Sequence, residues 1–156
     1  MRGPKFLLLL AAAGLFAISS CTTDKLDDKV LTATNLPLDG TQVVPARQVA
    51  GNGTMDVVYN KDTRTLSYTI RWNSLTGAVT AAHIHGGASR GSVGAQVQDF
   101  TSSITKAAAG TYSGTVLIDG VVLNQEDLLL GRYYVDIHTT ANSSTGEIRG
   151  QIENLK

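Results

Sequence analysis

The sequence has a single cysteine, Cys21, so no disulfide can form within one chain. Acidic and basic residues balance to a formal net charge of zero, and no basic cluster appears along the chain. This pattern argues against nucleic acid as a partner. No apolar run reaches the ~20 residues that a membrane-spanning helix needs. These absences leave a globular domain that depends on its own core for stability.

The first twenty residues have the pattern of a secretory signal. Arg2 and Lys5 precede an apolar run over residues 6–18, which is too short to span a bilayer. We therefore predict a signal peptide at residues 1–20. Its removal takes Arg2 and Lys5 away and leaves the remainder with a small excess of acidic residues.

The signal ends in Ile18-Ser19-Ser20-Cys21, which resembles a bacterial lipobox, where the thiol is lipidated and the chain is cut. Lipid on Cys21 would bind a membrane, because each buried methylene contributes about 0.8 kcal/mol. Thr22 does not resemble an inner-membrane retention signal, which favours the outer membrane of the cell envelope, on its periplasmic face or at the cell surface. We predict a lipidated Cys21 and tether over 21–29, followed by one domain over 30–156.

Alternating apolar residues predict β-strands from Val30 onward. Two such runs are Met55, Val57 and Tyr59, and then Leu66, Tyr68, Ile70 and Trp72. Residues 60–64 between them predict a hairpin turn. Asp119-Gly120 predicts a second hairpin, between strands at 114–118 and 121–123.

One segment has helical rather than strand character. Asn124 can cap a helix, Glu126 and Asp127 suit its first turn, and Gly131 suits its C-terminal end. These signals predict one short helix over residues 125–130. Together with six to eight short strands, they predict an all-β fold, an antiparallel Greek-key β-sandwich or barrel with one short helix.

The three histidines all fall in segments that alternate. His83 and His85 are two residues apart, so they lie on one face of a strand. In the segment 133–138, the side chains opposite the apolar ones are Tyr134, Asp136 and His138. In the segment 146–152, the polar side chains are Glu147, Arg149 and Gln151.

Three imidazoles that converge would suit copper or zinc, with metal–nitrogen distances of about 2.0–2.1 Å for zinc. We predict His83, His85 and His138 as ligands, supported by a polar cluster of Asp136, Glu147 and Arg149. The same residues could instead form a hydrogen-bonded network that needs no metal. The sequence leaves both arrangements open.

Signs of catalysis are few. No serine lies in a Gly-x-Ser-x-Gly motif, and the cysteine is assigned to the lipid. Asp136 and Glu147 have His138 and Arg149 beside them, which favours ion pairing over a raised carboxyl pKa. The sequence therefore favours a non-enzymatic protein that binds or scaffolds an unidentified envelope partner. A copper- or zinc-binding domain with a redox-related role is the alternative.

Four motifs in order resemble the CHRD domain, a family named for a repeat in chordin and common in bacterial secreted proteins. They are Gly-Thr-Gln-Val-Val-Pro at 40–45, a segment with Ala-His-Ile-His-Gly at 79–87, Leu-Gly-Arg-Tyr-Tyr-Val-Asp-Ile-His-Thr within 129–139, and Gly-Glu-Ile-Arg-Gly-Gln-Ile at 146–152. The resemblance implies a β-sandwich and an extracytoplasmic setting, and it implies no settled reaction.

A weaker likeness is to the copper-zinc superoxide dismutases, which have an immunoglobulin-like sandwich. The His-x-His pair and the spacing from Gly131-Arg132 to His138 carry it. Those enzymes also need further zinc-binding histidines, and this sequence has no fourth histidine. The likeness therefore implies at most a reduced copper or zinc site.

Overall fold

The computed structural model describes residues 29–156. The expected signal peptide, Cys21 and all but the last residue of the tether lie outside the described residues. In the described part, no helix is long and apolar enough to cross a membrane. The elements, in order, are β1 (Val30–Asp39), the 3-10 helix η1 (Gly40–Gln42), β2 (Asn52–Asn60), β3 (Thr65–Asn73), β4 (Val79–Gly86), β5 (Ala95–Asp99), β6 (Gly110–Leu117), α1 (Gln125–Leu129), β7 (Tyr133–Thr139) and β8 (Ile148–Ile152).

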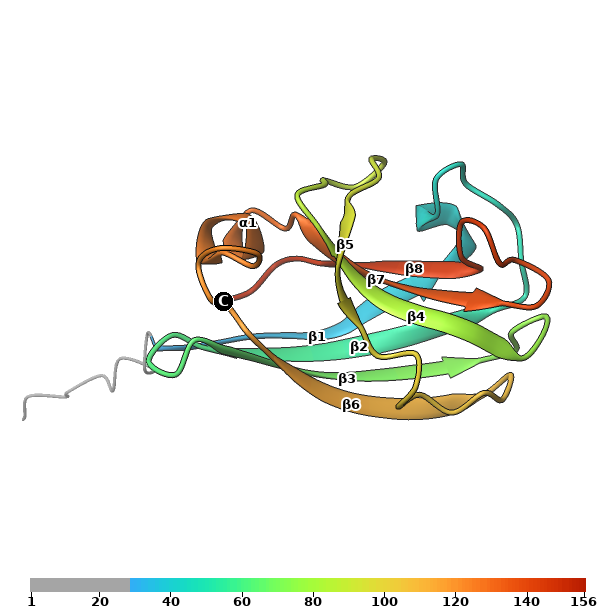
Figure 1. The fold of residues 1–156 in the computed structure, drawn as a ribbon, viewed down its shortest axis with the longest axis horizontal. Coiled ribbons are helices and arrows are strands. Elements are labelled where there is room, and N and C mark those ends of the chain that lie inside the picture. The colour runs from blue at the N-terminus through green and yellow to red at the C-terminus, as the bar shows by residue number, and fades with distance from the viewer. Residues whose placement is uncertain (1–28) are drawn as a thin grey trace, which may run out of the picture.

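The strands form one curled antiparallel sheet in the order β5-β4-β7-β8-β1-β2-β3-β6. The link between β8 and β1 is a single pairing, Arg149 with Asp39. On either side of it the sheet folds into two facing layers, β5-β4-β7-β8 and β1-β2-β3-β6 (Figure 1). The chain leaves the second layer after β3 and returns to it at β6, as in a Greek key. The predicted all-β sandwich is confirmed.

The apolar core lies between these layers. Met55 pairs with Ile70, and Val57 pairs with Tyr68, so the inward residues of β2 and β3 face the same side. All the residues predicted from these two runs are buried. Trp72 is 3% exposed, and its Nε1 donates a hydrogen bond to the main-chain oxygen of Ala107. Alternation in the sequence therefore identifies the core face of both strands.

One predicted hairpin is confirmed and the other is wrong. Between β2 and β3, the side chain of Asn60 accepts hydrogen bonds from the main-chain N–H groups of Asp62 and Thr63. After β6, residues 121–123 form no strand. The Asp119 side chain instead accepts hydrogen bonds from the N–H groups of all three, which curls the chain around it. β6 pairs instead with β3, which lies alongside it over its whole length.

The predicted helix is confirmed and ends one residue early. Oδ1 of Asn124 caps it by accepting a hydrogen bond from the N–H of Asp127 at 2.8 Å. Leu130 follows as the C-cap, and Gly131 has φ of +67°, the left-handed conformation that ends many helices. This helix closes one end of the sandwich (Figure 1).

The layer containing β7 and β8 has a second buried face. Tyr133, Val135 and Ile137 point to the apolar core, as predicted, yet every residue of β7 is buried. The outer face carries polar side chains that form hydrogen bonds with main-chain oxygens of the segments 87–94 and 140–147. These loops therefore cover the outer face of the sheet and shield a polar group of residues from water.

Candidate metal centre

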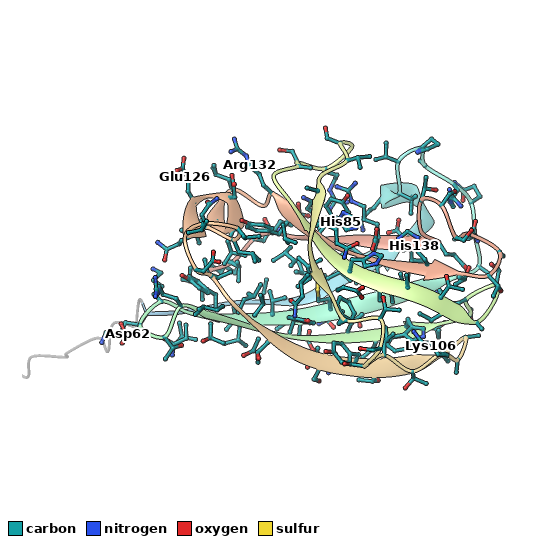
Figure 2. The ribbon with its side chains drawn as sticks, viewed as in Figure 1. Asp62, His85, Lys106, Glu126, Arg132 and His138 are labelled. Atoms are coloured by element: carbon teal, nitrogen blue, oxygen red, sulfur yellow. The ribbon has the colours of Figure 1, made fainter. Side chains whose placement is uncertain are left out.

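The three histidines meet on the outer face of the β4–β7 pair. His83 and His85 lie on β4, where Ala82 and Ile84 point into the apolar core. His138 lies on β7, and His83 is paired across the strands with Asp136. Figure 2 shows His85 and His138 on this layer, away from Asp62 in the β2–β3 hairpin.

Asp136 stands at the centre of this group. Its Oδ1 is 3.2 Å from Nδ1 of His83, and its Oδ2 is 3.1 Å from Nε2 of both His85 and His138. The ring centroid of His83 lies 5.5 Å from that of His85 and 5.1 Å from that of His138. The shared strand face expected from the sequence therefore brings all three imidazoles to one carboxylate.

Main-chain carbonyl groups fix which nitrogen carries the proton in two of the rings. Nδ1 of His85 lies 3.0 Å from the oxygen of Gly94, and Nδ1 of His138 lies 2.9 Å from the oxygen of Ser143. A carbonyl oxygen only accepts, so each Nδ1 must donate an N–H. In the neutral ring, Nε2 then presents a lone pair to Oδ2 of Asp136, which is itself an acceptor.

This arrangement needs a cation. Nε2 of His85 is buried and off the direction required for a hydrogen bond to Asp136, so it has no hydrogen-bond partner among residues 29–156. Each Nε2 must therefore bind a proton or a metal ion to sit this close to the carboxylate.

The electrostatics agree with a cation at this position. Burial opposes ionisation of Asp136, but hydrogen bonds from His138 and His83 and the adjacent ring of His85 hold its carboxyl pKa far below the ordinary range. Burial also opposes the charge on His85, and the adjacent Asp136 outweighs it and raises the pKa of His85. The hydrogen bond to Asp136 raises the pKa of His138 in the same way. Asp136 thus remains an anion that attracts positive charge.

The side chains that can hold one ion together are His83, His85 and Asp136, whose ligand atoms all lie within 4.8 Å of one another. His138, the third ligand predicted from the sequence, lies outside this group, although its Nε2 contacts Oδ2 of Asp136. Two tetrahedral ligands at about 2.0–2.1 Å from zinc lie about 3.3–3.4 Å apart. The 3.1 Å separations around Oδ2 are close to that value, so small side-chain movements would make room for an ion.

Arg149 lies on the same face and packs against Tyr134. Its guanidinium carbon lies 3.5 Å above the ring of Tyr134, and the Tyr134 ring stacks on His85 with centroids 4.9 Å apart. Arg149 and Gln151 also hydrogen-bond to main-chain oxygens of the β4–β5 loop, at Ser92 and Ala88 respectively. The stack therefore holds the ring of His85 in place and ties down the loop that supplies the Gly94 carbonyl.

Glu147 lies in a different network from the one predicted. Its carboxylate accepts hydrogen bonds from the N–H and hydroxyl of Thr76, the hydroxyl of Thr139 and the amide of Asn142. The predicted alternation fails here because β8 begins only at Ile148, after Gly146 with φ of +79°. Glu147 thus fastens the 140–145 loop that carries the Ser143 carbonyl.

The sequence gives no direct signal for the two carbonyl groups. Any residue carries a main-chain oxygen, so Gly94 and Ser143 cannot be identified by residue type. Gly94 has one indirect signal, because an added Cβ would clash with the main-chain oxygen of Gly86. Tyr134 was identifiable from alternation, but its stacking between His85 and Arg149 was not.

A family model of the CHRD domain matches residues 34–152. This range includes all three histidines, Asp136, Glu147 and Arg149. No curated protein and no solved structure matches the chain.

Proposed function

The chain belongs to the CHRD domain family, and we propose that this member binds one divalent transition-metal ion, copper or zinc, at the histidines around Asp136. The observation that carries the proposal is the pair of fixed tautomers. Because the Gly94 and Ser143 carbonyls hold the two Nδ1 protons, the unprotonated Nε2 atoms of His85 and His138 both lie 3.1 Å from the same carboxylate oxygen. A hydrogen bond from the far ring nitrogen to a carbonyl is typical of histidines that bind metals.

A metal ion satisfies the site better than protons do. To bond Asp136 without metal, both His85 and His138 would have to be imidazolium ions, close to each other and on the same face as the permanently charged Arg149. Like charges in a poorly solvated site repel strongly. One divalent ion held by His83, His85 and Asp136 would occupy the Nε2 lone pair of His85 and neutralise Asp136 at the same time. Imidazole and carboxylate ligands suit zinc and copper.

We further propose that the domain works at the bacterial cell envelope, as a lipoprotein anchored through Cys21. Support comes from the signal-like run over residues 6–18 and the lipobox-like Ile18-Ser19-Ser20-Cys21. The tether would present the domain at the membrane surface, where it binds a metal and a further envelope partner without catalysing a reaction. The outer membrane is the proposed location, since Thr22 does not resemble a retention signal.

Calorimetric titration of the mature protein with zinc or copper(II) tests the metal site, with no polyhistidine tag on the protein. We expect one ion per chain with micromolar or tighter affinity. His85→Ala and Asp136→Asn should abolish this binding, because each removes one of the converging groups. Asp62→Asn changes an exposed carboxylate in the β2–β3 hairpin and serves as the control, with unchanged affinity. A folded wild-type protein that binds no ion would leave a metal-free polar network as the role of the cluster.

A further inference from the structure

Arg149 is a buried cation without an anionic partner in the described part of the chain. Only 2% of the residue is exposed, and within residues 29–156 no carboxylate lies within 4.0 Å of its guanidinium. Its hydrogen-bond acceptors are neutral: the oxygen of Ser92 at 2.7 Å, the side-chain oxygen of Gln151 at 2.8 Å and, more weakly, the oxygen of Ser89. Nε of Arg149 has no acceptor in the described part of the chain. A buried charge in this state is costly unless something compensates it.

A cavity of about 120 Å³ lies beside this guanidinium. Arg149, His85, His138 and Asp136 line it, together with the hydroxyl-bearing residues Ser144 and Thr145 at its exposed rim. The hydroxyl of Thr145 accepts a hydrogen bond from Arg47, so its own hydrogen is free to be donated. Thr145 therefore offers a hydrogen-bond donor at the rim.

Asp136 does not balance the charge of Arg149. Both of its oxygens already lie against imidazole nitrogens, and neither lies within 4.0 Å of the guanidinium. Within residues 29–156 the guanidinium of Arg149 therefore has no carboxylate in contact with it, whatever the histidines hold.

We propose that this cavity binds a small oxyanion of the carboxylate type, held by the guanidinium of Arg149 and the hydroxyl groups at the rim. Arginine suits such a ligand because its planar donors match a carboxylate. The volume corresponds to roughly four water molecules at about 30 Å³ each, which fits formate, acetate or bicarbonate.

The anion site extends the proposed metal function and does not depend on it, because the charge of Arg149 is permanent. When the histidines hold an ion, the anion would lie next to it, since His85 and His138 line the same cavity. The domain would then bind an anion together with a metal ion, with affinity for each raised by the other.

Nuclear magnetic resonance of the mature protein tests this site with sodium formate as the probe. Formate is titrated against a sodium chloride control at constant ionic strength, into protein stripped of metal and into protein loaded with zinc. We expect a saturable shift of the Arg149 Nε–H signal and of the Ser144 and Thr145 amides with formate only. Arg149→Lys should weaken formate binding at least tenfold, whereas Arg132→Lys, which alters an exposed ion pair with Asp127, should leave it unchanged.

A second variant tests the cavity independently if Arg149→Lys does not fold. Val44 lines the cavity and is partly exposed, so Val44→Trp would fill the space from its rim without entering the apolar core. It should abolish the formate shifts while the protein stays folded. Equal shifts with chloride, or undiminished formate binding in Val44→Trp, would overturn the anion site. Formate binding by protein that takes up no zinc would support the anion site and contradict the metal function. Zinc uptake without formate binding would support the metal function and contradict the anion site.

Discussion

Nδ1 of His138 lies 2.9 Å from the main-chain oxygen of Ser143, five residues further along the chain. This hydrogen bond joins a candidate metal ligand on β7 to the loop that follows it. The same loop is held from its other side by Glu147, which accepts hydrogen bonds from Asn142, Thr76 and Thr139. Loop and ligand are thus parts of one arrangement, and the orientation of the ring depends on the position of the loop.

The first prediction concerns the protonation of His85 and His138. Nitrogen-15 spectra of the side chains in metal-free protein should show Nδ1 of both rings protonated, because each donates to a carbonyl group. Addition of zinc should shift the Nε2 signals of these rings and leave the Nδ1 protons in place. A ring with Nδ1 unprotonated in the metal-free protein would contradict the fixed tautomers.

The second prediction concerns acid stability and Glu147. Burial opposes its ionisation, but hydrogen bonds from Thr139, Thr76 and Asn142 outweigh this and hold its pKa below the ordinary 4.5. Its stabilising contribution is therefore fully present above about pH 4.5 and is lost as the pH falls through the lowered pKa of the folded state. Glu147→Gln should lower the free energy of unfolding near neutral pH by about 1.5–3 kcal/mol, the scale of a hydrogen bond to a charged group.

Denaturant unfolding of both proteins across pH 3–7 measures this effect. The gap between wild type and Glu147→Gln should narrow as the pH falls below 4.5. A gap that stays constant over this range would show that the carboxylate charge of Glu147 contributes nothing.

The third prediction concerns the apolar core. Trp72→Ala should lower the free energy of unfolding by about 3–5 kcal/mol, since deletion of a buried aromatic side chain leaves a cavity. Val58→Ala is the control on the neighbouring strand, where the side chain is 42% exposed, and it should cost less than about 1 kcal/mol. Equal losses from the two variants in urea unfolding would mean that Trp72 does not pack as described.

The fourth prediction concerns the anchor. Cys21→Ser should prevent lipidation and move the protein from the detergent phase to the aqueous phase in detergent partitioning. Thr22→Ser, which leaves the cysteine in place, serves as the control and should remain in the detergent phase. Full retention of Cys21→Ser in the detergent phase would rule out anchorage by that residue.

Strand alternation predicts most of this fold. It identifies the core faces of β2, β3 and β7 because one side of each strand packs in the apolar core, where period-two patterns are strict. It places His83, His85, Asp136 and His138 on a shared outer face for the same reason. Asp119-Gly120 misled the prediction, because a turn motif specifies the local bend and not the partner of the strand before it.

Other features depend on contacts between distant segments. The polar side chains of β7 and β8 suggest an exposed face, yet loops cover them, and no local pattern encodes that cover. The carbonyl groups of Gly94 and Ser143 reach the histidines only after these loops fold over the sheet. Glu147 breaks the alternation because Gly146 turns the chain just before β8.

Anomalous X-ray diffraction from crystals of the zinc-loaded protein, recorded on both sides of the zinc absorption edge, tests the metal site most directly. We expect one strong peak per chain, about 2.0–2.1 Å from Nε2 of His85 and beside the carboxylate of Asp136. Peaks confined to exposed side chains, or none at the histidines in crystals that contain zinc, would contradict the metal site.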